Sequence, residues 1–211
     1  MESALPSPLE RRLAGALVKT AFLRDRRGGP WEPPAHLAHE KVTFEGNTGA
    51  RLAGRWFPAE RPRGAVVLAH PDRRYGQHWF VKEGWVEFLP RAGYDVLTFD
   101  FVGYGGSRGP ATYYHEDVHA AARLAYDWAG GFPVHVVGVS MGAFAVANAS
   151  PRLDFVESIV LESPYPSFNA WYGKGPGRWA MEAFDLLFPR SSRSIQAEAN
   201  VARAAACTSS W

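Results

Sequence analysis

The residues Gly138-Val139-Ser140-Met141-Gly142 follow the apolar run Val134-His135-Val136-Val137. A G-x-S-x-G pattern between a strand and a helix is the nucleophile elbow, a sharp turn that lifts a serine hydroxyl out of a sheet. Its glycines leave room where a Cβ would collide with a neighbouring strand or helix, and they tolerate unusual backbone angles. A serine hydroxyl alone is a poor nucleophile and needs a base, normally a histidine that a carboxylate orients. The pattern therefore predicts that Ser140 is a nucleophile whose base lies elsewhere in the chain.

Strands and helices alternate on both sides of this motif. The continuous apolar run 65–69 is typical of a strand buried on both faces. We expect 96–99 to be another buried strand and 156–161 to be the strand that follows the elbow and its helix. Between the runs, apolar residues recur at helical spacing: Val81, Trp85, Phe88 and Leu89 before Pro90 and Gly93, then Val118, Ala121, Ala125 and Trp128 before Gly130. The alternation predicts a mostly parallel, doubly wound α/β sheet, with right-handed crossovers and helices on both faces.

Two shorter β-type runs, 41–45 and 51–57, precede the first buried strand and are separated by the turn sequence 46–49, which predicts an N-terminal β-hairpin. Polar residues stand at or just beyond the ends of the later strands: His70, Asp100, Ser140 and Glu162. Reactive groups in such sheets gather at the carboxyl ends of the strands. We therefore expect these four side chains to lie along one edge of the sheet.

Composition excludes several function classes. At 211 residues the chain can bury a substantial core as one domain, and its net charge of +2 is too small to indicate a nucleic-acid partner. Cys207 is the only cysteine, which rules out an internal disulfide and indicates a reducing compartment, the cytoplasm. The glycine-rich loop 103–107 lacks the spacing of a dinucleotide fingerprint. We expect neither a cofactor nor a bound metal.

Residues 1–30 are set apart from the α/β domain, which we expect to span 31–211. Apolar residues at helical spacing in 9–23 predict an amphipathic helix, followed by a linker. Three interpretations remain open for this helix: docking on the domain, weak contact with a membrane surface, or a secretory signal. A signal fits least well because Lys19 interrupts its apolar core.

The order of these elements resembles the α/β-hydrolase superfamily, specifically its single-domain serine hydrolases of the serine-aminopeptidase and prolyl-oligopeptidase-like type. Four motifs carry the resemblance, which covers residues 41–206: Val67-Leu68-Ala69-His70-Pro71, Phe99-Asp100-Phe101-Val102-Gly103-Tyr104-Gly105-Gly106-Ser107, the elbow, and Leu161-Glu162-Ser163-Pro164. The resemblance implies Ser140 as nucleophile and the backbone N–H of Met141 as one donor of the oxyanion hole.

The second donor comes, in the family, from the loop after the strand that ends at His70. Relatives usually have glycine after this histidine, whereas this chain has Pro71, and proline carries no N–H. The donor therefore shifts to the backbone N–H of Asp72 or Arg73, of which we favour Asp72. A carboxylate beside a developing oxyanion would repel it unless the Asp72 side chain points away.

A larger departure concerns the base and the acid. In the family these follow the nucleophile on two later strands, yet all seven histidines of this chain precede Ser140, and the chain ends at Ser209-Ser210-Trp211 where the next strand is expected. We therefore expect a fold that lacks its last two strands. Glu162 is the best remaining acid, and His70 is a weaker substitute for the base.

Two function classes follow from these features. The first is a serine hydrolase that cleaves a small-molecule ester, thioester or amide through an acyl-Ser140 intermediate, with weak or no activity in this length. The second is a truncated product or a non-catalytic binding module that keeps the fold. In either case the last strand would be an unpaired edge, at which we expect self-association.

Overall fold

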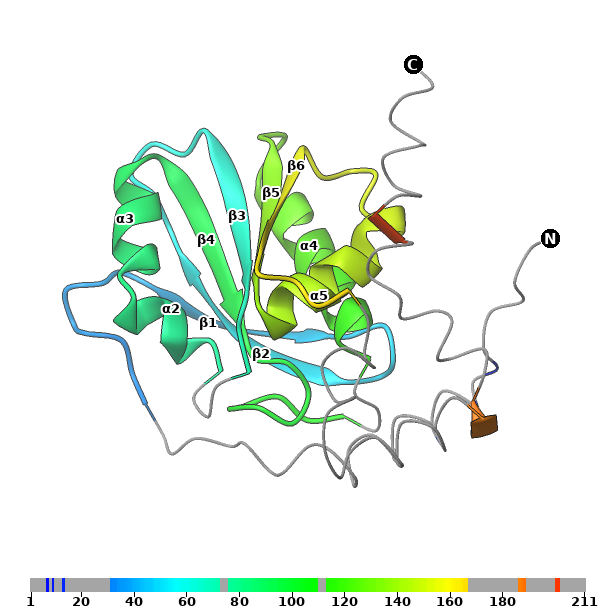
Figure 1. The fold of residues 1–211 in the computed structure, drawn as a ribbon. Helices are drawn as coiled ribbons and strands as arrows, with labels where there is room; N and C mark the ends of the chain where they lie inside the picture. Colours follow the sequence, from blue (N-terminus) through cyan, green and yellow to red (C-terminus); the bar gives the residue numbers. More distant parts are fainter. Residues whose placement is uncertain are drawn as a thin grey trace, which may run out of the picture.

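In the computed structural model, residues 31–72, 76–109 and 113–166 are described, together with Ser7, Leu9, Leu13, 186–188 and 200–201. Within these residues one six-stranded sheet has the order β1-β2-β4-β3-β5-β6 (Figure 1). The strands are β1 (Glu40–Glu45), β2 (Arg51–Phe57), β3 (Gly64–Ala69), β4 (Tyr94–Phe99), β5 (Val134–Val139) and β6 (Ser158–Glu162). The helices are α2 (His78–Lys82), α3 (Trp85–Arg91), α4 (Tyr114–Trp128), α5 (Met141–Ala149) and the short 3-10 helix η1 (Ser150–Arg152).

Strand directions match the expected mixture of a hairpin and a parallel sheet. β1 and β2 form an antiparallel hairpin, and β2 then pairs antiparallel with β4. The strands β4, β3, β5 and β6 are mutually parallel. Since β4 lies on one side of β3 and β5 on the other, the strand order reverses at β3, where open α/β sheets place their ligands.

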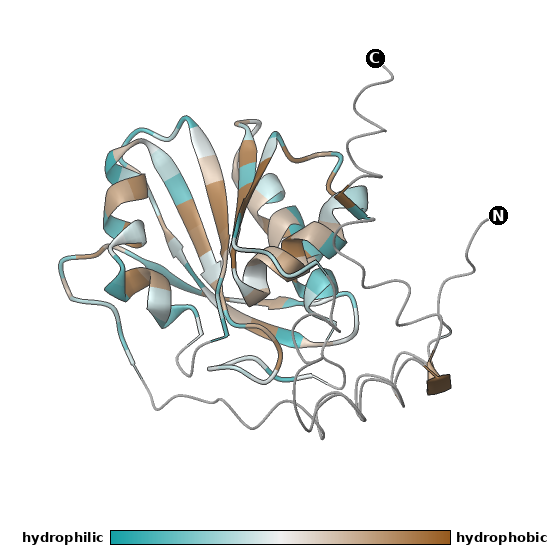
Figure 2. Ribbon diagram, viewed as in Figure 1, coloured by the Kyte–Doolittle hydropathy of each residue, from teal (hydrophilic) through white to brown (hydrophobic). Residues whose placement is uncertain are grey.

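The centre of the sheet is buried on both faces because its strands are largely apolar. All six residues of β3 are buried, and hydrophobic segments are seen along the central strands in Figure 2. Ala65, Val67 and Ala69 pack into a core with α4 and α5, whereas Val66 and Leu68 pack into a second core with α2 and α3. Successive residues of a strand point to opposite faces, so the two helix pairs cover opposite faces.

One helix expected from the sequence is two helices in the structure. The stripe from Val81 to Leu89 predicts a single helix closed by Pro90, but α2 ends at Lys82 and α3 begins at Trp85. Gly84 between them has φ +76°, a left-handed conformation that ends a helix and that glycine adopts without a Cβ penalty. Pro90 lies inside the last turn of α3. The expectation of one continuous helix was wrong.

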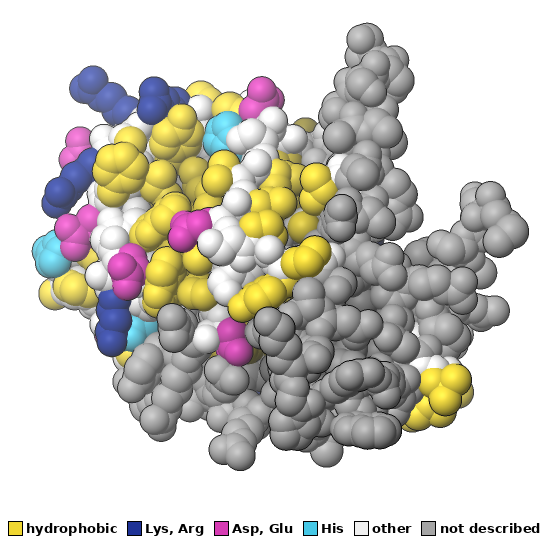
Figure 3. Space-filling view, in the orientation of Figure 1, with side chains coloured by type: hydrophobic (Ala, Val, Ile, Leu, Met, Phe, Trp, Pro, Cys, Tyr) yellow, Lys and Arg dark blue, Asp and Glu magenta, His cyan; other side chains and the backbone are white. Residues whose placement is uncertain are grey.

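Among the described residues, β6 is an edge of the sheet and pairs only with β5. Its residues are exposed or half-buried, and Val160 at its centre is 52% exposed. Apolar side chains reach the surface on the face of the molecule in Figure 3, over the strands between α3 and β6.

Most of the predicted amphipathic helix 9–23 lies outside the described residues, as does Cys207. The described residues include no helix with the length and apolarity needed to cross a membrane.

Candidate active site

Ser140 occupies the turn between β5 and α5. Its backbone angles are φ 54° and ψ −111°. Residues other than glycine rarely adopt this combination, which costs roughly 1–3 kcal/mol. Two backbone bonds hold the turn: Ser140 N–H donates to Glu162 O at 2.8 Å, and Phe144 N–H donates to Ser140 O at 3.0 Å. Ser140 Oγ makes no hydrogen bond within the described part of the chain, and the residue is half-buried. A strained turn thus presents the Ser140 hydroxyl at the carboxyl end of β5.

The two glycines of the motif are required by close backbone contacts. A Cβ on Gly142 would lie 2.0 Å from Ala69 O, at the end of β3. A Cβ on Gly138 would lie 2.6 Å from Gly142 O and 2.7 Å from Ala143 N. Since these neighbours are backbone atoms, no side-chain rotation relieves the clash. This is the steric requirement expected from the sequence.

His70 lies at the end of β3 and is completely buried. Its Nδ1 lies 2.8 Å from Pro71 O, a carbonyl that can only accept, so Nδ1 carries the proton. Its Nε2 accepts the N–H of Phe101 at 3.2 Å. Burial lowers the pKa of His70 below its ordinary value, although the nearby Asp100 carboxylate opposes this shift. Both ring nitrogens are bound to backbone groups, which argues against His70 as a base for Ser140 and assigns it to shaping the loop.

The other histidines are also engaged away from Ser140. All six, like His70, lie in the described residues, and none hydrogen-bonds to Ser140 Oγ. Their partners are Glu87 for His36, Leu37 O for His39, the Trp31 ring for His78, Glu116 for His115, Asn47 for His119, and Ser158 Oγ for His135. Glu162 ends β6 with an exposed side chain. Its backbone oxygen, rather than its carboxylate, is what reaches Ser140.

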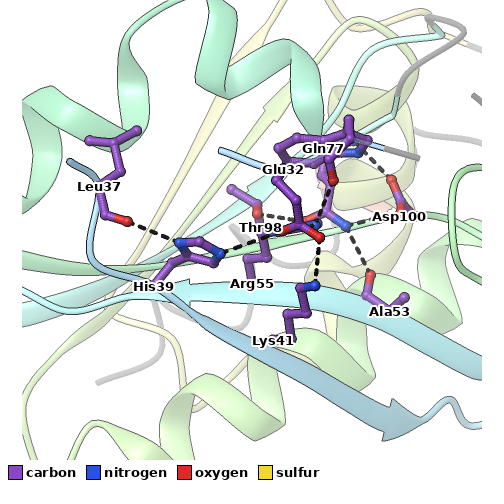
Figure 4. Close-up of polar contacts among 10 residues, drawn as sticks. Glu32, Leu37, His39, Lys41, Ala53, Arg55, Gln77, Thr98 and Asp100 are labelled. Carbon is purple, nitrogen blue, oxygen red and sulfur yellow. Dashed lines mark hydrogen bonds and ion pairs between the residues drawn. The ribbon is translucent and has the colours of Figure 1, made fainter. Parts of the chain in front are cut away.

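Asp100 ties together the two loops that follow β3 and β4. Its Oδ1 accepts the N–H of Gln77 at 3.0 Å, and its Oδ2 accepts Gln77 Nε2 at 2.9 Å and the N–H of Gly106 at 3.0 Å. Gln77 also accepts from Thr98 Oγ1 at 2.8 Å and donates to Ala53 O (Figure 4). The network couples the loop before α2 to the loop after β4.

Tyr104 belongs to the same loop after β4 and reaches both residues that the sequence predicts as oxyanion donors. Its hydroxyl donates to Asp72 Oδ1 at 2.6 Å and lies 3.4 Å from Met141 Sδ. Met141 is the first residue of α5 and is fully buried. Asp72 is half-buried in the loop after β3, and Arg73, the alternative donor, lies outside the described residues.

A second polar group joins the segment before β1 to the β1–β2 hairpin. The Arg55 guanidinium lies 4.0 Å from the Trp31 ring centroid and pairs with Glu32, which also pairs with Lys41. The hydrogen bond from Lys41, together with Arg55, holds the pKa of Glu32 below its usual value. Trp31, Lys41 and Arg55 border a hollow of about 400 Å³, which Gln77 and Asp100 also line. Ser140 does not line this hollow, so it is distinct from the elbow.

The loop after β4 is also held from α4. The Oδ2 of Asp117 accepts the N–H of Val102 at 3.1 Å, while Oδ1 is buried without a hydrogen-bond partner. Burial raises the pKa of Asp117 well above its usual value. Among the described residues, no cluster of three or more His, Cys, Asp or Glu side chains could hold a metal ion.

The arrangement of elbow, sheet and loops has counterparts among known proteins. Residues 60–208 match the family described as serine aminopeptidase, S33. The chain belongs to this family of α/β-hydrolases. It is therefore a member of a hydrolase family, as the four sequence motifs predict.

Relatives of this serine aminopeptidase family member are distant and longer. The protein YfhR of Escherichia coli (strain K12) is 26% identical over 148 residues, which cover 64% of this chain and 50% of YfhR. The human protein ABHD12B is 34% identical over 94 residues, which cover 41% of this chain and 25% of that protein. The chain thus spans about half the length of the bacterial relative.

Solved structures agree on the fold. An α-β hydrolase from Vibrio vulnificus superposes with a TM-score of 0.64 at 18% identity, covering 93% of this chain and 72% of that one. An esterase from Pyrococcus furiosus superposes with a TM-score of 0.59 at 23% identity, covering 78% of this chain and 68% of that one. At these identities the likeness establishes the α/β-hydrolase fold alone.

Sequence reasoning missed two features of this serine aminopeptidase family member. Gln77 was not singled out, although Thr98, a threonine among the apolar residues 96–99, signals a buried polar partner. The Tyr104 hydroxyl was also missed, because a tyrosine in a glycine-rich loop gives no sign of which residues it reaches.

Proposed function

We propose that the chain is a serine hydrolase whose nucleophile is Ser140 and whose substrate is a small-molecule ester, thioester or amide. The observation that supports this best is the strained elbow at the end of β5, whose hydroxyl makes no hydrogen bond to any residue that the structure describes. Strain is retained at such a position when the surrounding structure over-determines it, and it clusters at active sites.

The proposed reaction begins with attack of Ser140 Oγ on the substrate carbonyl carbon. A new C–O bond forms, the bond to the leaving alkoxide, thiolate or amine breaks, and the hydroxyl proton passes by way of water to the leaving group. Water then hydrolyses the acyl-Ser140 ester and restores the serine. The backbone N–H groups of Met141 and Asp72 would stabilise the tetrahedral oxyanion, a contribution worth about 10²–10³ in rate for one donor elsewhere.

The rate should be low in these 211 residues. No histidine hydrogen-bonds to Ser140, and His70 has both nitrogens engaged with backbone groups. Glu162 has an exposed carboxylate that no histidine connects to the serine. An oxyanion hole and substrate binding without a working triad retain roughly 10³–10⁴-fold catalysis over water. A non-catalytic binding module is the alternative if even this residual activity is missing.

Labelling with a fluorophosphonate tests the proposal directly. We expect slow covalent labelling of the purified chain, lost in Ser140→Ala and kept in Ser158→Ala, which removes an exposed serine on β6. Peptide mapping by mass spectrometry should locate the adduct on Ser140. Equal labelling of the wild type and of Ser140→Ala, or none in either, would contradict a nucleophilic Ser140 and favour the non-catalytic module.

A further inference from the structure

Tyr104 contacts both residues that carry the proposed oxyanion donors. We propose that Tyr104 is the positioning residue of this oxyanion site: its hydroxyl holds the Asp72 carboxylate away from the space beside Ser140 and fixes the backbone amides of Asp72 and Met141. The inference rests on the proposed function, because it gives Tyr104 a role in the proposed hydrolysis.

The position of Tyr104 is strongly constrained by its surroundings. The residue is only 1% exposed, and its ring packs edge-on against His70, with the ring centroids 4.8 Å apart. Gly103 and Gly105 on either side have φ angles of +92° and +39°, which glycine adopts readily. A Cβ on Gly105 would lie 2.0 Å from Asp100 Oδ2, so the Asp100 network seats the loop closely. The hydroxyl is therefore held at a defined point.

The Tyr104 hydroxyl compensates for a consequence of Pro71, which moves the proposed donor to an acidic residue. With no N–H at this position, the nearest donor of the loop is Asp72, whose own carboxylate is close to its amide. A negative charge free to turn toward the oxyanion would destabilise it. The 2.6 Å contact to Tyr104 has the length of a charge-assisted O–H···O⁻ bond, the stronger class of hydrogen bond. Tyr104 thus gives Asp72 Oδ1 a neutral hydrogen-bond donor.

The contact with Met141 is of a different kind. A phenol has one hydrogen, and the short bond to Asp72 takes it, so the Met141 sulfur at 3.4 Å packs against the oxygen. Met141 is completely buried at the start of α5. Its backbone N–H follows Ser140 directly, so a fixed side chain helps to fix that amide. One hydroxyl thereby links donors from two separate elements.

The test is a double-mutant cycle on labelling of Ser140 by a fluorophosphonate. We expect Tyr104→Phe to label roughly tenfold more slowly than the wild type, the lower end of what a hydrogen bond to a charged group contributes. Asp72→Asn removes the charge but keeps an acceptor, so it should label close to the wild-type rate. Adding Tyr104→Phe to Asp72→Asn should cause little further loss. Tyr126→Phe, which removes an exposed hydroxyl on α4, serves as the matched control.

A purely structural role would give another pattern. General damage to the loop would slow labelling by the same factor with Asp72 or Asn at that position, and this result, or no effect of Tyr104→Phe, would overturn the inference. Amide ¹H–¹⁵N spectra provide a readout that does not depend on activity: Tyr104→Phe should shift the signals of Asp72 and Met141, and Tyr126→Phe should not. If the wild type is not labelled at Ser140, the proposed function fails. The amide spectra of Tyr104→Phe still test the positioning role in that case: unchanged Asp72 and Met141 signals would overturn it, and shifted signals would support it.

Discussion

Replacing Asp100 by asparagine should destabilise the fold by about 2–4 kcal/mol. The carboxylate is 2% exposed and accepts three hydrogen bonds, two from Gln77 and one from Gly106. An asparagine has one acceptor oxygen, so either orientation of its amide points an NH₂ group at an N–H donor. Placing the NH₂ at the Oδ1 position leaves one buried donor without an acceptor, which costs about 1–3 kcal/mol.

The other contributions act in both directions. The two hydrogen bonds that remain change from a charged to a neutral acceptor and weaken by about 1 kcal/mol each. The lower cost of burying a neutral amide offsets part of this loss. For a chain of this size, the net change corresponds to a decrease in Tm of about 5–15 °C.

Equilibrium unfolding in urea, followed by circular dichroism and extrapolated to water, measures the change. Asp127→Asn is the matched control, because Asp127 is exposed on α4, and it should change the unfolding free energy by less than about 0.5 kcal/mol. A loss of under about 0.5 kcal/mol in Asp100→Asn would refute the reasoning that this carboxylate ties the two loops together.

Three further changes test other parts of the structure. Gly142→Ala would bring a Cβ to 2.0 Å from Ala69 O, so it should lower the unfolding free energy in urea by about 3 kcal/mol. A Cβ on Gly130 would have nothing within 4 Å, so Gly130→Ala should cost only the roughly 1–2 kcal/mol of a left-handed backbone. Asp117→Asn should make the unfolding free energy less dependent on pH. Because the folded pKa of Asp117 is raised, the wild type loses stability as pH rises above the unfolded pKa of about 3.9. If the stability of the variant relative to the wild type did not increase between pH 4 and 8, this reasoning would be contradicted. Val160→Lys on the edge strand β6 should weaken concentration-dependent self-association in sedimentation velocity, whereas Phe88→Lys on α3, which also replaces an exposed apolar residue, should not. A wild type that stays monomeric would contradict association through this edge.

Much of the fold could be predicted because burial leaves a periodic trace in sequence. The uninterrupted apolar run of β3 and the helical stripe of α4 each indicate which side chains of the segment are buried in the core. The predicted positions of His70, Asp100 and Ser140 at strand ends are confirmed. The break between α2 and α3 was not predicted, because the stripe continues across Gly84 and only the local backbone conformation ends the first helix.

The candidate site was harder to predict because its contacts join residues far apart in the chain. Sequence reasoning could rank His70 as a substitute base from its place after a strand. It gave no indication that Pro71 O and the Phe101 N–H occupy the two ring nitrogens. The same holds for Gln77, whose partners Ala53, Thr98 and Asp100 come from β2 and from the end of β4.

By itself, the sequence determined the α/β-hydrolase fold, the family and the elbow at Ser140, because glycine spacing and apolar periodicity are local properties that a linear pattern records. Only the tertiary structure decided which polar groups are already engaged. His70 is bound to two backbone groups, and the Tyr104 hydroxyl reaches Asp72 across 32 positions of sequence. The physical reason is that hydrogen bonds depend on distances of a few ångströms, which are set by how loops from separate strands pack at the edge of the sheet.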